Sequence, residues 1–228
     1  MKKWTELERV TTPDGSVLSL ATHDRDYAIR VNGRELMSTR HSHSEEQLGI
    51  VGCQPLAQSR AAHVLIGGLG LGFTLRAALV SLPRDAHVVV AELLPEVVTW
   101  NQNPAYALAS AALADPRTEV VLGDVALVIE RSAACFDAIL LDADNETTAM
   151  NTAGNRRLYR ASGLAAVHRA LTEHGRAVYW SAGQEPEFAK RFASSGFDVE
   201  VRRVRRHVSS KASHYLLIGQ RKTAPSPR

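Results

Sequence analysis

The sequence has little cysteine, no long apolar segment and no large excess of charge of either sign. Its only cysteines are Cys53 and Cys135, and no CxxC spacing occurs, so neither a disulfide framework nor a zinc site is indicated. No stretch approaches the roughly 18 apolar residues of a membrane span, and the first residues become charged where a leader would be apolar. We therefore expect a soluble, cytoplasmic protein with no membrane partner.

Charge is nearly balanced, with 27 Lys and Arg against 24 Asp and Glu and a formal net charge of +3. This balance gives no support for nucleic-acid binding, which usually requires a strongly basic surface. The chain also lacks internal repeats and low-complexity tracts. At 228 residues with 45% hydrophobic content it can bury one sizeable core, so disorder is not expected.

The strongest local charge feature lies near the carboxyl end, around the expected turn between the last two strands. It consists of Arg202, Arg203, Arg205, Arg206, His207 and Lys211. One interpretation is a solvated sheet edge whose positive charge discourages aggregation. The other is an attraction for an acidic substrate or a phosphate backbone. Because no aromatic residues are interleaved for base stacking, a nucleic-acid partner is not expected.

Residues 1–43 predict a small β-hairpin appendage. Asn32 and Gly33 form a hairpin signal between short β-type runs at residues 27–31 and 35–37. From Ser44 the segment "SEEQLGIVGC" predicts a short helix with a serine cap and an acidic first turn.

Residues 44–220 alternate between strand-like and helix-like patterns. Four times a short β-branched run precedes a helical one, as in "HVLIGG" followed by "FTLRAALVSL". This is typical of βαβ units, so the fold class is α/β with a mostly parallel, doubly wound sheet. A further strand "RAVYWS", a helix "EPEFAKRFASS" and two final strands complete the domain, and residues 221–228 predict a flexible tail.

Three glycines, Gly68, Gly70 and Gly72, lie in the loop "GGLGLG" between an expected strand and helix. Their missing side chains let a ligand approach backbone amides at the helix amino end, although the glycines could also serve only a tight turn. Glu92 ends the next strand, 20 residues beyond Gly72, where a carboxylate can accept from ribose hydroxyls. Asp124 ends the third strand and could accept from an adenine amino group. The three strand ends predict a nucleoside site.

Together "GGLGLG", Glu92, "LGD" and "FDAILLDAD" resemble the class I S-adenosylmethionine-dependent methyltransferases, and within them most closely the spermidine synthases. The resemblance covers residues 34–219. It includes "HSEEQLG", similar to the family's Tyr-His-Glu segment, and "LYRASGLAAVHRALTEHGRAVY", similar to its helix and turn before the fifth strand. It implies a Rossmann-like, seven-stranded sheet with an antiparallel last strand, an S-adenosyl nucleoside as cofactor, and pairing as a homodimer.

The resemblance also implies catalytic residues. Asp142 corresponds to the family's catalytic aspartate, which orients and deprotonates the acceptor amine. The second family aspartate falls on Asn145, and its neighbour Asp144 is expected to stand in for it. Glu46 corresponds to the segment beside the amine pocket. The other interpretation is that Asp142 caps the following segment and Asp144 is solvated.

The sequence departs from the family where the chemistry lies. Spermidine synthases read GGGDGG, and the loop aspartate holds the amine of decarboxylated S-adenosylmethionine, whereas Gly70 and Leu71 stand here. The family's glutamine at the end of the fifth strand falls near Trp180 or Ser181. We therefore favour methyl transfer from S-adenosylmethionine to a small acceptor, most simply an amine.

Two alternatives stay open. One is spermidine synthase activity, aminopropyl transfer from decarboxylated S-adenosylmethionine to a polyamine precursor, with Asp144 or Glu146 replacing the loop carboxylate. The other is a non-catalytic nucleoside-binding partner protein.

No metal site is predicted. Residues 142–145, "DADN", are similar to the "DADK" of metal-dependent O-methyltransferases, but the next strand runs into "WSAGQEP" without their Asp-Asn pair. Hard cations require several oxygen ligands, which one carboxylate loop does not supply. Residues 41–46, "HSHSEE", form only a local cluster with no distant third ligand.

Overall fold

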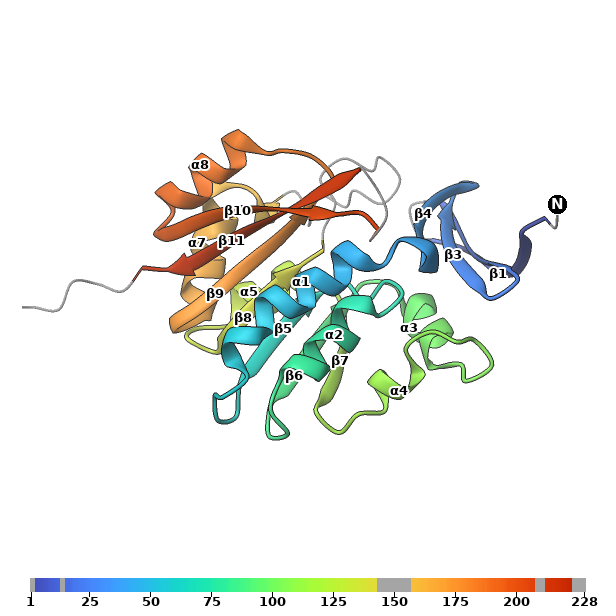
Figure 1. Cartoon of the computed structure of the whole chain (residues 1–228), viewed down its shortest axis with the longest axis horizontal. Helices are drawn as coiled ribbons and strands as arrows, with labels where there is room; N and C mark the ends of the chain where they lie inside the picture. Colours follow the sequence, from blue (N-terminus) through green and yellow to red (C-terminus); the bar gives the residue numbers. More distant parts are fainter. Residues whose placement is uncertain (1–2, 13–14, 143–156, 208–211, 223–228) are drawn as a thin grey trace, which may run out of the picture.

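The chain folds into a seven-stranded sheet flanked by helices, with a second, smaller sheet at the amino end (Figure 1). The computed structural model describes residues 3–12, 15–142, 157–207 and 212–222.

The strands and helices follow one another in the order that the sequence pattern indicates. The strands are β1 (Thr5–Thr11), β2 (Val17–His23), β3 (Asp26–Val31), β4 (Arg34–Ser38), β5 (His63–Gly67), β6 (His87–Glu92), β7 (Thr118–Leu122), β8 (Phe136–Leu141), β9 (Leu171–Ser181), β10 (Phe197–Arg205) and β11 (Ser213–Arg221). The helices are α1 (His43–Cys53), α2 (Phe73–Ser81), α3 (Pro95–Gln102), α4 (Ser110–Leu113), α5 (Val125–Arg131), α7 (Ala161–Ala170) and α8 (Pro186–Ser194). Two 3₁₀ turns are η1 (Thr39–His41) and η2 (Gln54–Leu56).

The amino-terminal unit is a four-stranded antiparallel sheet in the order β1-β2-β3-β4. The predicted hairpin joins β3 to β4, and Asn32 and Gly33 both adopt positive φ, at 50° and 79°. Positive φ at both central residues is the geometry of a tight hairpin turn, which Asn-Gly favours. The predicted hairpin is therefore confirmed, and it is one half of a larger sheet.

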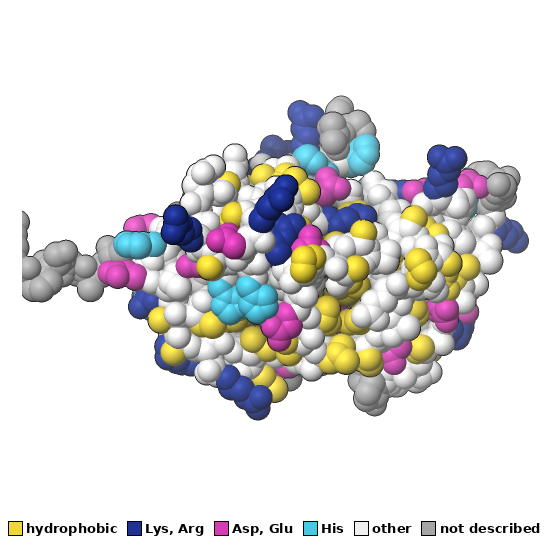
Figure 2. Space-filling model, turned by 90° about the horizontal axis from the view of Figure 1, so that it is seen from below, with side chains coloured by type: hydrophobic (Ala, Val, Ile, Leu, Met, Phe, Trp, Pro, Cys, Tyr) yellow, Lys and Arg dark blue, Asp and Glu magenta, His cyan; other side chains and the backbone are white. Residues whose placement is uncertain are grey.

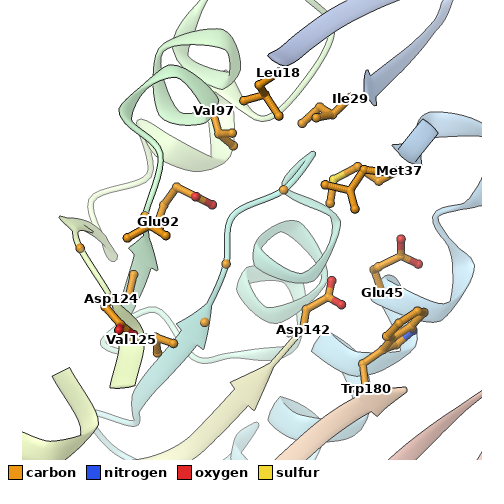
Figure 3. A pocket seen from close by; sticks show the side chains of 17 residues that line it. Leu18, Ile29, Met37, Glu45, Glu92, Val97, Asp124, Val125, Asp142 and Trp180 are labelled. Carbon is orange, nitrogen blue, oxygen red and sulfur yellow. The ribbon is translucent and has the colours of Figure 1, made fainter. Parts of the chain in front are cut away.

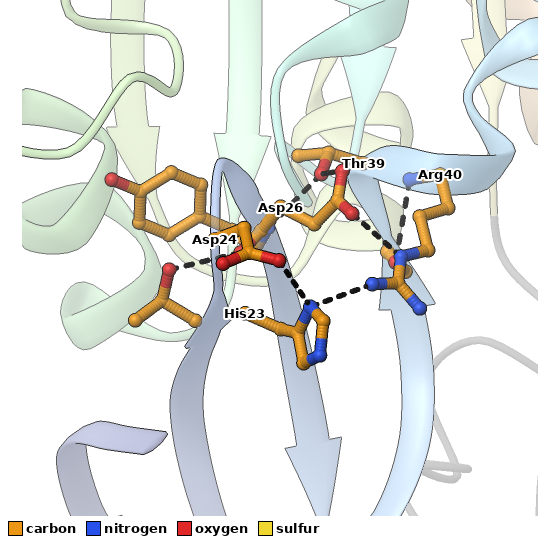
Figure 4. Close-up of polar contacts among 8 residues, drawn as sticks. His23, Asp24, Asp26, Thr39 and Arg40 are labelled. Atoms are coloured by element: carbon orange, nitrogen blue, oxygen red, sulfur yellow. Dashed lines mark hydrogen bonds and ion pairs between the residues drawn. The ribbon is translucent and has the colours of Figure 1, made fainter. Parts of the chain in front are cut away.

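Polar contacts fix the exit of this sheet toward α1 (Figure 4). Arg40 donates from Nε to Asp26 Oδ2 at 2.6 Å, and its Nη2 lies 3.0 Å from His23 Nδ1. The Thr39 hydroxyl accepts from the Tyr27 backbone N–H at 3.0 Å. These bonds connect η1 to β3 and so fix the position of the small sheet relative to the start of α1.

The large sheet has the strand order β10-β11-β9-β8-β5-β6-β7. Neighbours from β9 to β7 pair in parallel, whereas β11 pairs antiparallel to both β9 and β10. This confirms the predicted mostly parallel, seven-stranded α/β sheet with an antiparallel last strand.

Both faces of the large sheet are buried, and alternate strand residues supply the two cores. Val64 and Ile66 of β5 pack with residues of α1, α2, α3 and α4, whereas Leu65 packs on the other face with residues of α5, α7 and α8. Continuous apolar strands are what such a two-sided sheet requires.

Three boundaries differ from the sequence-based expectations. Helix α1 begins at His43, with Ser42 at its N-cap and no side-chain cap bond, so Ser44 is not the cap and lies within the first turn. Strand β9 begins at Leu171, directly after α7, where a turn was expected. Arg221 ends β11 and does not belong to the tail, whose residues 223–228 lie outside the described part of the chain.

None of the described helices combines the length and hydropathy required to span a membrane. On the face of the molecule seen in Figure 2, basic and acidic side chains are interspersed.

Candidate functional site

A pocket opens at the carboxyl ends of the central strands, against the small sheet (Figure 3). The chain leaves β5 toward β6 on one side, and β8 lies on its other side, so strand order reverses there. Open α/β sheets bind ligands at such a switch point. The lining residues are Leu18, Ile29, Leu36, Met37, Glu45, Gly67, Gly68, Gly70, Ala91, Glu92, Leu93, Val97, Gly123, Asp124, Val125, Asp142 and Trp180.

The glycine loop adopts the left-handed backbone conformations that its sequence indicates. Gly68, Gly70 and Gly72 have φ of 91°, 53° and 75°. Gly68 and Gly70 line the pocket, whereas Gly72 is the N-cap of α2. A Cβ at Gly72 would lie 2.3 Å from the Cβ of Ala109, so its role is close packing. The predicted loop thus divides into two pocket glycines and one structural glycine.

Glu92 lies at the end of β6 and is only 7% exposed. Its Oε2 accepts from the Leu69 N–H at 2.8 Å, and its Oε1 accepts from the Leu94 N–H at 2.9 Å. Burial raises the pKa of Glu92 above its ordinary value, and the backbone N–H donors oppose this rise. The backbone N–H groups of Gly70 and Leu93 also act on this carboxylate, so ribose hydroxyls would share its oxygens with several backbone donors.

Asp124 reaches the same end of the pocket but is already engaged. Its Oδ1 accepts from the Ala126 N–H at 2.8 Å and caps α5, and its Oδ2 accepts from Arg157 Nη2 at 3.1 Å. The sequence interpretation did not include the cap or Arg157. An adenine amino group would share a carboxylate whose orientation these two contacts fix.

Asp142, Glu45 and Trp180 lie at the other end of the pocket from Glu92 and Asp124 (Figure 3). The Asp142 backbone N–H donates to the Gly67 carbonyl at 3.3 Å, which anchors the residue beside the glycine loop. Asp144, the second predicted catalytic aspartate, lies outside the described residues.

The pocket glutamate on α1 is Glu45; Glu46, the predicted one, does not line the pocket. Successive helical residues project about 100° apart, so only one of the two glutamates can face a given wall. The sequence contains both in "HSEE", and choosing between them requires knowing which face of the helix packs toward the pocket. Burial raises the pKa of Glu45, and the hydrogen bond from Ser44 opposes this effect.

The wall facing the glycine loop is apolar and comes from the small sheet. Leu18, Ile29, Leu36 and Met37 supply it, and a Cβ at Gly70 would lie 2.9 Å from Met37 Sδ. Sequence analysis did not find this wall, because alternation within a strand does not show which domain a side chain faces.

The charge of the pocket is one-sided. Four carboxylates line it, from Glu45, Glu92, Asp124 and Asp142, and none of its described lining residues is Lys, Arg or His. Such a pocket favours cationic ligands over anionic ones. Among the residues that the structure describes, no three His, Cys, Asp or Glu side chains gather as a metal site, and the absence of a metal remains a prediction.

Similarity to known proteins is found among solved structures. No family model and no curated protein matches the sequence. The solved spermidine synthase from Thermotoga maritima matches with a TM-score of 0.73 and 17% identity, over 97% of this chain and 74% of that chain. A spermidine synthase in complex with the transition state analogue AdoDATO matches with a TM-score of 0.75 and 19% identity, over 97% of this chain and 75% of that chain. The chain therefore has the spermidine synthase-like form of the class I methyltransferase fold.

Proposed function

We propose that the protein transfers an aminopropyl group from decarboxylated S-adenosylmethionine to an amine acceptor. The observation that carries this proposal is the one-sided charge of the pocket, four carboxylates with no basic side chain among its described lining residues. Decarboxylated S-adenosylmethionine carries a sulfonium and an amine but no carboxylate. Arg157 pairs with Asp124, but the carboxylate of intact S-adenosylmethionine would still add a further anionic group to a pocket lined by acidic side chains.

The similarity to solved structures also favours decarboxylated S-adenosylmethionine over S-adenosylmethionine as the donor. The neighbour bound to AdoDATO is a spermidine synthase, and its fold matches this chain over 97% of its length. The sequence favoured methyl transfer because Gly70 replaces the loop aspartate. In the folded chain Glu45 supplies a carboxylate from another element to the same pocket, so that departure loses much of its weight.

Within the pocket, each end has a distinct task. Glu92 and Asp124 hold the nucleoside, and the apolar wall excludes water from the reacting atoms. Asp142 and Glu45 orient the acceptor amine and stabilise its charge. The amine nitrogen forms a bond to the carbon beside sulfur, the carbon–sulfur bond breaks, and sulfur keeps the electron pair as a neutral thioether. The attacking lone pair becomes free when the acceptor ammonium gives one proton to a pocket carboxylate before the bond forms, and the product leaves as an ammonium.

Methyl transfer from S-adenosylmethionine to an amine is the second candidate. It is favoured by Gly70, whose missing side chain leaves the loop without a carboxylate and exposes backbone to the donor.

Calorimetric titration with the two donors tests the proposal. We expect decarboxylated S-adenosylmethionine to bind at least about tenfold more tightly than S-adenosylmethionine, a difference of about 1.4 kcal/mol. With a diamine present, mass spectrometry is expected to detect the aminopropylated amine and methylthioadenosine. Tighter binding of the intact donor, with a methylated product, contradicts the proposal and supports the second candidate.

Asp142→Asn is the matched variant for this assay. It keeps the size of the side chain and removes its charge, so we expect the cationic donor to bind up to about tenfold more weakly while turnover falls about 10²-fold. A non-catalytic binding protein would instead bind the nucleoside tightly and give no product with any amine of a broad panel. Wild type and Asp142→Asn would then not differ.

A further inference from the structure

A chain of hydrogen bonds leads from the acceptor end of the pocket to the last strand of the sheet. Glu45 Oε2 accepts from the Ser44 hydroxyl at 2.5 Å, and Ser44 Oγ lies 2.9 Å from His214 Nδ1. Glu45 lines the pocket, and His214 lies on β11. Three side chains thus connect the reacting end of the pocket with a half-buried imidazole.

Packing holds this chain in place. Ser44 is fully buried, so its hydroxyl has defined partners and no access to bulk water. The ring of Trp180, which also lines the pocket, contacts the ring of His214 with centroids 4.6 Å apart and an interplanar angle of 71°. Residues 170 positions apart in the sequence meet here, because α1 packs on β9, β10 and β11.

We propose that Glu45 receives the proton of the acceptor amine and that Ser44 and His214 carry a proton onward to solvent. The inference rests on the proposed transfer to an amine. Glu45 is the catalytic residue in this step, and Ser44 and His214 act through it as positioning residues.

The proton balance closes without any further reactant. The acceptor ammonium loses a proton to Glu45, and its nitrogen gains the lone pair that attacks the donor carbon. Once protonated, Glu45 donates its proton to Ser44 Oγ, while the Ser44 hydroxyl turns toward His214 and passes its own proton to Nδ1 of the Nε2–H tautomer. The imidazolium so formed loses its Nε2 proton to solvent, and exchange of the ring protons with solvent restores the Nε2–H tautomer, so that each group returns to its starting state.

Glu45 suits this role because it combines a raised pKa with a hydrogen-bonded path away from the pocket. Burial raises its pKa, which makes the carboxylate a better proton acceptor at neutral pH. The charged groups that act on it are Glu46 on the same helix, which raises its pKa, and Arg206, directly after β10, which lowers it. Asp142 lies beside it at the same end of the pocket (Figure 3).

Kinetics of Ser44→Ala and His214→Ala test the proton path. We expect turnover to fall about 10- to 10²-fold in both variants, while the Kd of the donor stays unchanged, since neither side chain lines the pocket. Added imidazole is expected to restore turnover in His214→Ala and not in Ser44→Ala. The matched control is His87→Ala, whose ring pairs with Glu119 at the opposite end of the strands. Turnover within twofold of wild type in both path variants overturns the inference.

The pH profile separates a proton path from mere support of the fold. Turnover is expected to rise with pH as Glu45 loses its proton. The Ser44 hydroxyl lowers the pKa of Glu45, so removing it should move the rising limb to higher pH. An unmoved limb in Ser44→Ala contradicts the inference, because a purely structural defect scales the profile without shifting it.

A spectroscopic measurement keeps the two proposals distinguishable. The carboxyl carbon of Glu45 is followed by NMR as pH is raised, in wild type, Ser44→Ala and His87→Ala. We expect a higher pKa for Glu45 in Ser44→Ala only. If wild type makes no product but this shift is present, the proposed function fails while the hydrogen-bonded chain stands. If product forms and the shift is absent, the proton path fails while the proposed function stands.

Discussion

Two carboxylates of the pocket are buried, and burial disfavours their charged forms. Glu45 and Glu92 both have raised pKa values, and burial is the largest cause for each. The hydrogen-bond donors around Glu92 are backbone N–H groups, whereas Glu45 has the Ser44 hydroxyl. A cationic ligand relieves this burial cost, so the unliganded pocket stores free energy that ligand binding recovers.

Glu45→Gln is expected to stabilise the unliganded protein at neutral pH. A raised pKa means that the charged form costs stability, and this cost grows as pH rises from the ordinary value of 4.5 through the raised pKa of Glu45. Chemical denaturation of both forms below 4.5 and at neutral pH should give equal stabilities at the lower pH and a more stable variant at the higher one.

Glu96→Gln is the control for this measurement, since it removes a carboxylate in the first turn of another helix, α3, that does not line the pocket. A stability gain as large as that of Glu45→Gln, or one that does not depend on pH, would contradict the burial argument.

At the scale of elements, one arginine joins the end of α2 to the start of β7. Arg117 donates from Nη1 to the carbonyls of Leu79, Leu82 and Pro83, at 2.9, 3.2 and 3.3 Å. Its Nε and Nη2 pair with the two oxygens of Asp115 at 2.9 and 2.8 Å. The guanidinium lowers the pKa of Asp115 to about 2. The pair therefore contributes stability above pH 3.8, and the contribution is lost as pH falls through about 2.

Arg117→Lys is expected to destabilise the protein by about 1–3 kcal/mol, because one ammonium cannot reach the carboxylate and three carbonyls together. Thermal or chemical denaturation at neutral pH measures the loss. Arg9→Lys is the control, since Arg9 pairs with Glu6 on an exposed strand and such pairs contribute little. Equal losses in the two variants would show that the junction does not depend on the guanidinium geometry.

The elements themselves could be predicted from the sequence wherever a periodic pattern was bounded by turn chemistry. The Asn32-Gly33 turn and the glycine loop mark their positions through local backbone requirements, and β5, β6 and β8 have the apolar runs of strands buried on both faces. The start of α1 was wrong because both Ser42 and Ser44 can cap a helix, and the difference lies in tertiary packing. The choice of Glu46 came from the resemblance, and the packing of α1 places Glu45 at the pocket instead.

At the scale of the whole molecule, the pocket requires both sheets. The strand ends supply its polar groups, and the small sheet supplies the apolar wall of Leu18, Ile29 and Met37. The sequence predicted Gly68, Glu92, Asp124 and Asp142 because strand ends of a parallel sheet meet at one edge. It could not predict the wall, the Trp180–His214 contact or the bond between His214 and Ser44, which depend on how distant segments pack.

The central claim is that a single adenosyl nucleoside lies across the strand ends with its sulfonium beside Asp142. Its most direct test is a crystal structure of the protein with decarboxylated S-adenosylmethionine. We predict that the ribose hydroxyls contact Glu92, that the adenine lies beside Asp124, and that the sulfur faces Asp142 and Glu45. Density for the compound elsewhere on the protein, or strand ends closed by the protein's own side chains, would contradict the account.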